Sequence, residues 1–132
     1  MKRDMDLIRL ILFSIEAQYR LTAIYDLAVD GYDKETVAYH CKILHEAGLI
    51  EDYKALYAND KLQSFGILGL TWSGQDYLDK IRDDSIWNKT KETIKTKGLP
   101  LMLETIKTIA SAFITAAAEG VANSIIKNGG VE

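Results

Sequence analysis

Cysteine, proline and histidine are scarce in this 132-residue chain. It contains one cysteine, one proline and two histidines. A single cysteine argues against a disulfide framework and against a thiolate metal site. A chain of this length also buries enough apolar surface to fold without disulfides or metals. We therefore expect a cytoplasmic protein that holds no metal and no cofactor.

The two histidines do not form a metal-binding pair. His40 and His45 are five residues apart, which on a helix places their side chains about 140° from each other. Helical metal-binding pairs need a separation of three or four residues. We expect His40 to be a hydrogen-bonded, partly buried side chain.

A membrane-targeting segment is also missing. The first twelve residues carry charges of both signs, so they lack the apolar core of a secretory signal. Residues 109–126 are nearly apolar, but Glu119 and Asn123 interrupt them and alanine contributes little transfer energy. We expect this stretch to pack in a soluble protein, with no membrane partner.

The N-terminal part of the chain carries a net negative charge. The net charge is −3 overall, with −4 in residues 1–83 and +1 in residues 84–132. Domains of this size that bind nucleic acids are more often basic. The acidic balance therefore weighs against nucleic-acid binding and favours a basic partner.

Apolar residues at helical spacing predict a first helix over residues 4–18. Residues 22–29 follow as a short extended piece. A turn at Gly31 leads to Asp33, which suits the N-cap of a second helix, and Gly48 suits its left-handed C-cap. The expected buried stripe of this helix is Val37, His40, Cys41, Leu44 and Ala47, and the expected outward side is Lys34, Glu35, Ala38, Tyr39, Lys42 and His45.

Two strands and another helix complete the first part of the chain. Residues 49–57 and 66–72 read as strands, joined by a polar connection over 58–65, and Ser73 then suits the N-cap of a helix that ends near Arg82. This order predicts an α+β fold. It is typical of a winged helix-turn-helix domain over residues 1–83, in which the two strands form the wing.

The rest of the chain, 84–132, predicts a helical extension. A connecting helix is expected over 84–96 and a long helix over 100–127, with Pro100 in its first turn. A seam with 4-3-4-3-4 spacing along the long helix favours dimerisation; its residues are Met102, Ile106, Ile109, Phe113, Ala116 and Gly120. The alternative is that this helix packs back on its own domain.

Two tryptophans could serve packing or recognition. We expect Trp72 and Trp87 to pack in the core between the wing and the following helices. The alternative is that they anchor a protein interface.

Three stretches resemble a known family when they are taken together: residues 1–9, residues 31–50 and residues 70–89. The first reads Met1-Lys2-Arg3-Asp4-Met5-Asp6-Leu7-Ile8-Arg9, the second ends Glu46-Ala47-Gly48-Leu49-Ile50, and the third begins Leu70-Thr71-Trp72-Ser73-Gly74. They resemble the family catalogued as domain of unknown function 2513, related to YjcQ-like winged-helix proteins of phages and other mobile elements. The resemblance implies a winged-helix fold and a mobile-element origin, and it brings no activity or catalytic residue.

The pattern favours a DNA-binding, dimeric and non-enzymatic regulator. Candidate DNA contacts are Lys34, Tyr39, Lys42 and His45 on the second helix, with Lys54 and Lys61 on the wing. The alternative is a module that engages a host or phage protein and binds no DNA. The acidic residues after Gly74 read as a solvated surface with helix capping, not as a catalytic pair.

Overall fold

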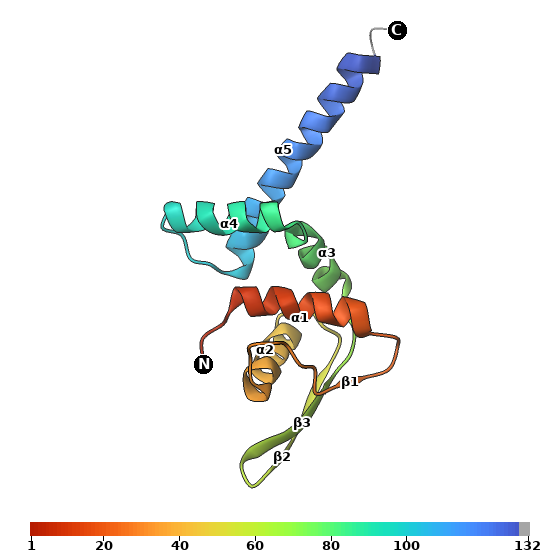
Figure 1. Ribbon diagram of the computed structural model, residues 1–132, viewed down its shortest axis with the longest axis vertical. Helices are drawn as coiled ribbons and strands as arrows, with labels where there is room; N and C mark the ends of the chain where they lie inside the picture. The colour runs from red at the N-terminus through yellow and green to blue at the C-terminus, as the bar shows by residue number, and fades with distance from the viewer. Residues whose placement is uncertain (130–132) are drawn as a thin grey trace. The chain divides into compact units, whose positions relative to one another are not determined.

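The computed structural model describes residues 1–129. Over this range the chain is an α+β protein with five helices and a three-stranded antiparallel sheet (Figure 1). It divides into two compact units, Met1–Leu78 and a second that begins at Asp79. The division falls inside helix α3, Trp72–Ile81.

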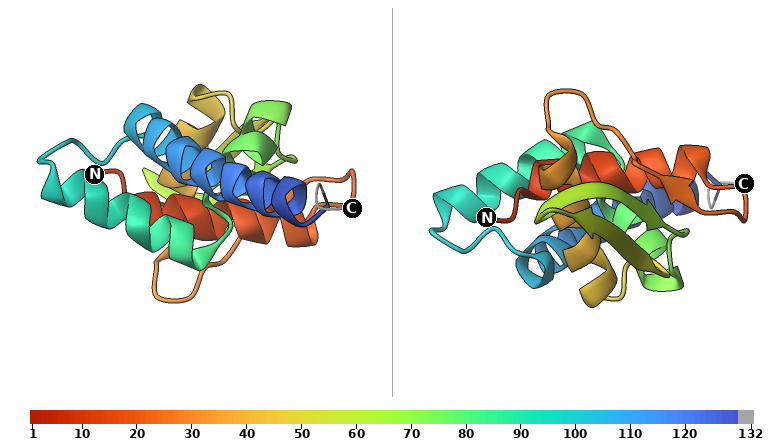
Figure 2. Two further views of the ribbon diagram at one scale, coloured as in Figure 1. Left: turned by 90° about the horizontal axis from the view of Figure 1, so that it is seen from above. Right: turned by 90° about the horizontal axis from the view of Figure 1, so that it is seen from below.

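The first unit is built from two helices, the sheet and the first residues of α3. Helix α1 spans Met5–Gln18 and helix α2 spans Lys34–Glu46. Helix α2 is seen between α1 and the hairpin in Figure 1, and the view from below in Figure 2 has the hairpin in front of both helices. The core is formed by the apolar faces of these elements, and its largest buried side chains include Leu7, Ile11, Leu12, Ile15, Leu44, Phe65 and Ile67.

An aspartate caps the start of each of these two helices, which was expected for α2 and not for α1. The Asp4 carboxylate accepts a hydrogen bond from the Leu7 N–H at 3.0 Å, and the Asp33 carboxylate accepts one from the Thr36 N–H at 2.7 Å. Gly48 ends α2 with a φ of +77°, a conformation that glycine adopts without steric cost. The predicted starts of α1 and α2 are therefore confirmed.

The sheet has the order β1-β3-β2. Strand β1 is short, Ile24–Tyr25, while β2 spans Tyr53–Ala58 and β3 spans Lys61–Ile67. The predicted polar connection over 58–65 is wrong. Asn59 and Asp60 form a tight turn with φ of 54° and 61°, because Asn and Asp tolerate the left-handed region that two-residue hairpin turns require.

Helix α3 begins at Trp72, two residues earlier than a cap at Ser73 predicts. The Thr71 hydroxyl, not Ser73, accepts the hydrogen bond from the Gly74 N–H, at 3.0 Å. The same hydroxyl donates to the Gly48 carbonyl at 2.6 Å, so the start of α3 is tied to the end of α2. Gly74 is required here, because a Cβ at this position would lie 1.9 Å from the Leu49 carbonyl oxygen.

The second unit pairs α4, Asp84–Thr96, with α5, Leu103–Gly129. The bounds predicted for the connecting helix are confirmed, and the Asp83 carboxylate caps it by accepting from the Ile86 N–H at 2.9 Å. Pro100 does not lie in the first turn of the long helix, which begins three residues later. The buried side chains of α4 and α5 are Trp87, Thr90, Ile94, Ile106 and Ala110.

Candidate nucleic-acid interface

Helix α2 has one buried face and one exposed face. Val37, Cys41 and Leu44 are buried as predicted. The expectations for two alanines are wrong, because Ala38 is buried and Ala47 is exposed. Ala47 falls after the last residue of the helix, where the chain already turns toward Gly48, so it no longer follows the helical stripe.

His40 fixes the orientation of α2 against α1. Its side chain is fully buried. The Nε2 atom accepts a hydrogen bond from the Asp4 N–H at 2.8 Å, and Nδ1 lies 2.8 Å from the Thr36 carbonyl oxygen. Because Nε2 accepts, Nδ1 must carry the proton and donate it to that carbonyl. The prediction of a hydrogen-bonded His40 is confirmed, and the Tyr32 hydroxyl strengthens the junction by donating to Asp4 at 3.1 Å.

Lys34 is engaged inside the first unit. Its ammonium group donates to the Gln63 carbonyl at 2.5 Å and lies 3.2 Å from the Asp26 carboxylate. The hydrogen bond from the Phe65 N–H lowers the pKa of Asp26 below its ordinary value, and the interaction with Lys34 lowers it further, by a smaller amount. A phosphate contact by Lys34 would have to compete with these interactions.

Three other candidate residues of α2 remain at the surface. Lys42 and His45 are exposed, and Tyr39 is half-buried with its ring edge against His40 at a centroid distance of 5.4 Å. His45 lies 4.0 Å from the Asp52 carboxylate. These side chains can reach a ligand that approaches the outer side of α2.

The two lysines of the hairpin occupy different places. Lys61 directly follows the Asn59–Asp60 turn and is exposed. Side chains alternate between the faces of a strand. Tyr53 and Phe65 stack on the inner face, with ring centroids 6.2 Å apart, so Lys54 lies on the outer face of the sheet, away from the core.

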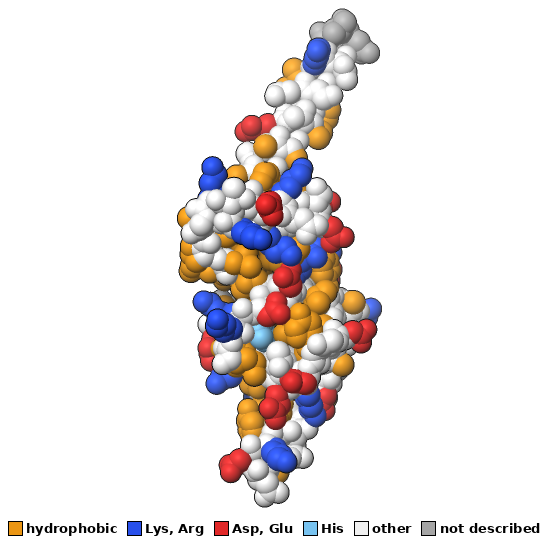
Figure 3. Space-filling view, turned by 60° about the vertical axis from the view of Figure 1, so that its left-hand side comes forward, with side chains coloured by type: hydrophobic (Ala, Val, Ile, Leu, Met, Phe, Trp, Pro, Cys, Tyr) orange, Lys and Arg blue, Asp and Glu red, His pale blue; other side chains and the backbone are white. Residues whose placement is uncertain are grey.

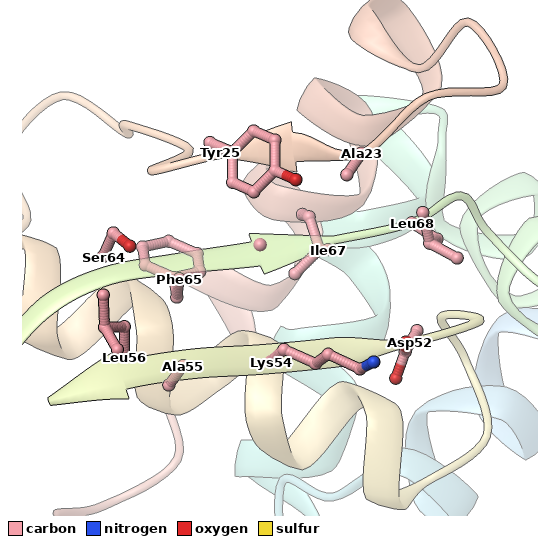
Figure 4. Close-up of a pocket in the computed structure, with 11 residues that line it drawn as sticks. Ala23, Tyr25, Asp52, Lys54, Ala55, Leu56, Ser64, Phe65, Ile67 and Leu68 are labelled. Carbon is pink, nitrogen blue, oxygen red and sulfur yellow. The ribbon is translucent and has the colours of Figure 1, made fainter.

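The outer face of the sheet is hollowed. Register places Tyr25, Gly66 and Lys54 in one row across the three strands, and Figure 4 shows Tyr25 and Lys54 on opposite sides of β3. The Tyr25 ring lies over Gly66, where a Cβ would be 3.1 Å from Cε1. The resulting open groove of about 370 Å³ is lined by Ala23, Tyr25, Asp52, Lys54, Ala55, Leu56, Ser64, Phe65, Gly66, Ile67 and Leu68. In the sequence, the signal for this groove was Gly66, which lies in the strand expected over 66–72.

The two tryptophans have different environments. Trp87 is buried in the second unit as expected. The prediction that Trp72 packs in the core is wrong, because its side chain is 90% exposed. Trp72 is the first residue of α3 and not, as expected, the last residue of a strand.

Along the long helix, the predicted dimer seam is split. Ile106 is fully buried within the chain. Ile109 and Phe113 are half-buried, and Met102, Ala116 and Gly120 are exposed. The middle of the seam, from Ile106 to Phe113, therefore packs at least partly inside the chain, and both its ends are open to solvent.

Other kinds of site find no support among residues 1–129. This range contains no cluster of three or more His, Cys, Asp or Glu side chains that could hold a metal ion. In the acidic stretch after Gly74, Asp79 pairs with Arg82 at 2.8 Å and Asp83 caps α4.

Residues Leu103–Asn128 form a helix that is long and apolar enough to cross a membrane, with only 6% of its apolar window buried.

Most of the chain matches a known protein family. The sequence model of the family described as "Hypothetical protein (DUF2513)" matches residues 2–100. The chain belongs to this family. An "Uncharacterized protein" of Haemophilus influenzae is 44% identical over 118 residues, which covers 87% of this chain and 97% of that protein. No solved structure matches the chain. The family match ends before α5 begins.

Proposed function

We propose that this member of the DUF2513 family is a non-enzymatic winged-helix regulator that binds DNA as a dimer, serving a phage or another mobile element. The observation that carries the proposal is the set of side chains on the outer side of α2. Its outer side presents Tyr39, Lys42 and His45, and its inner side is fixed to α1 and the sheet. A rigid helix with cationic and aromatic groups on its outer side suits insertion into a groove.

The order of elements supports this proposal. A helix, a short strand, a second helix and a β-hairpin follow one another in the first unit, as in winged-helix domains. One departure is clear within the described chain: residues 26–33, between β1 and α2, contain no helix. Helix α2 would therefore act alone with the hairpin, and fold-level analogy has to be tested at the residues themselves.

The charges of α2 limit the affinity of a single copy. Glu35 and Glu46 lie on the same helix as Lys42, and no Arg, Asn or Gln on this helix offers bidentate base contacts. Phosphate contacts would then dominate, and two linked copies would strengthen them.

Fluorescence anisotropy with a labelled DNA duplex at several salt concentrations tests the proposal. Lys42→Glu should abolish the salt-dependent binding, because it reverses a charge on the proposed contact surface. Lys97→Glu is the matched control, since it makes the same charge change at an exposed lysine that follows α4 and is not one of the candidate DNA contacts. The proposal fails if wild-type protein shows no affinity at low salt, or if both substitutions act equally.

A second candidate function, binding to another protein without DNA, is favoured by Trp72. Its 90% exposure is unusual for the largest apolar side chain, and Leu21 is 86% exposed with a strained φ of 74°. Exposed tryptophans are common anchors of protein interfaces. Under this reading Trp72→Ala would abolish capture of a host protein, and Lys42→Glu would leave the capture unchanged.

A further inference from the structure

More than half of helix α5 is not covered by other described residues of the chain. Helix α4 has 13 residues and α5 has 27. Ile106 and Ala110 of α5 are fully buried, but every residue from Thr115 to Asn128 is exposed. Few charged side chains appear on the distal part of α5 in Figure 3. An isolated helix of this length is only marginally stable in water, so a packing partner would stabilise it.

The distal half carries its own apolar stripe, which we call the distal stripe. It consists of Ile114, Ala118, Val121 and Ile125, with 4-3-4 spacing. At 100° per residue these four positions fall within about 60° of one another. Val121 is 61% exposed and Ile125 is 65% exposed. Spacing of this kind is what one helix presents to another.

The distal stripe is not the seam that the sequence suggested. Ala116 and Gly120 lie on another side of the helix, more than about 120° from the centre of the stripe. They share that side with Glu119, Asn123 and Lys127. Ala116 and Gly120 provide little apolar area, so the stripe is the better surface for association.

We infer that the distal stripe binds the distal stripe of a second copy of this chain, with the two helices antiparallel. In that arrangement Ile114 faces Ile125 of the other copy, and Ala118 faces Val121. A two-fold dimer requires such a self-complementary surface. The flanking residues Thr115, Ala117, Ala122 and Ser124 are all small and uncharged, so the backbones can approach closely without charge repulsion.

A lipid bilayer suits this helix less well than a second copy. Glu119 and Asn123 would lie inside a span over Leu103–Asn128, and polar groups there are costly unless they are paired. In the antiparallel dimer both side chains stay in water. This inference supplies the dimer of the proposed function, and it is tested without DNA so that the two can fail separately.

Two adjacent isoleucines make a matched test. Ile125 and Ile126 are 65% and 69% exposed, but only Ile125 belongs to the distal stripe. Sedimentation equilibrium of the full chain should give a dimer for wild type and for Ile126→Asp. Ile125→Asp should weaken the dimer roughly tenfold or more, because an unpaired carboxylate would be buried in the interface. Circular dichroism would verify that both variants remain folded.

Several outcomes would overturn the inference. These are a wild-type chain that stays monomeric at high micromolar concentration, equal effects of the two substitutions, or a dimer broken by Ala116→Asp but not by Ile125→Asp. Flotation of monomeric wild-type protein with phosphatidylcholine and phosphatidylglycerol vesicles would assign the helix to a membrane instead.

Discussion

The Asp26 carboxylate lies 3.2 Å from the Lys34 ammonium group, and together the two side chains extend the edge of the sheet where β1 ends. Asp26 accepts from the Phe65 N–H at 3.0 Å, and Lys34 donates to the Gln63 carbonyl. Side chains thus satisfy two backbone groups of β3 that a longer β1 would have satisfied. The pair joins β1, α2 and β3.

Asp26→Asn should lower the thermal unfolding temperature more than Asp30→Asn, which removes the same charge from an exposed turn. Because the native contacts lower the pKa of Asp26, its contribution to stability is complete above the ordinary aspartate value of 3.8 and is lost as the pH falls below that value. The stability difference between wild type and Asp26→Asn should therefore shrink in acid. A difference that grew in acid would contradict the assignment.

Gly74→Ala should destabilise the protein by roughly 1–3 kcal/mol in urea unfolding. The added Cβ would lie 1.9 Å from the Leu49 carbonyl oxygen, so the backbone of α3 or of Leu49 would have to move. Gly120→Ala is the control, since a Cβ there meets nothing within 4 Å and alanine favours a helix. Equal stability of the two variants would refute the close approach.

His40 should be the neutral tautomer with its proton on Nδ1. Nitrogen-detected histidine spectra of the folded protein distinguish this tautomer from the Nε2–H form, and a proton on Nε2 would contradict the hydrogen bond from the Asp4 N–H. His40→Ala should cost about 2 kcal/mol, because the Asp4 N–H and the Thr36 carbonyl would lose their partner.

Cys41 should react with thiol reagents only when the protein opens. Its side chain is fully buried, and burial raises the pKa of the thiol to about 12. A buried thiol that stays protonated is a poor nucleophile. Modification by a disulfide reagent should be slow in buffer and fast in denaturant, and rapid modification of the native protein would show that α2 is accessible from its inner side.

The two tryptophans should be separable by fluorescence. Trp72 is 90% exposed and Trp87 is 3% exposed, so acrylamide should quench Trp72 strongly and Trp87 weakly. Trp72→Phe should therefore shift the emission toward shorter wavelength and remove the strongly quenched component. The same result from Trp87→Phe would mean that the environments are reversed.

Periodicity in the sequence, together with the expected caps Asp33 and Gly48 of α2, was enough to predict four of the helices closely. Asp4, Asp33 and Asp83 each lie one residue before a helix and accept from an N–H three residues later. Gly48 and Gly98 both have positive φ just after helices α2 and α4. These signals are readable because capping depends on residues within one or two helical turns.

The hairpin could not be predicted as well. Register depends on which residues of β2 and β3 face the same side, and the pairing Ala58↔Lys61 fixes it through a two-residue turn. The short polar stretch around Asn59 reads equally as a longer loop. Similarly, no local pattern indicates that Thr71, one residue before Trp72, starts α3 through a bond to Gly48.

Contacts between distant residues decided the candidate site. Lys34 reads as a free cation on a helix, but Asp26 and Gln63, which lie far from each other in the chain, hold it in the fold. The long helix reads as one continuous seam, but α4 covers only its first turns. The sequence by itself determined four of the helices closely, the caps of α2 and the family. The tertiary structure alone decided which side chains remain available, because burial and pairing depend on neighbours far away in the sequence.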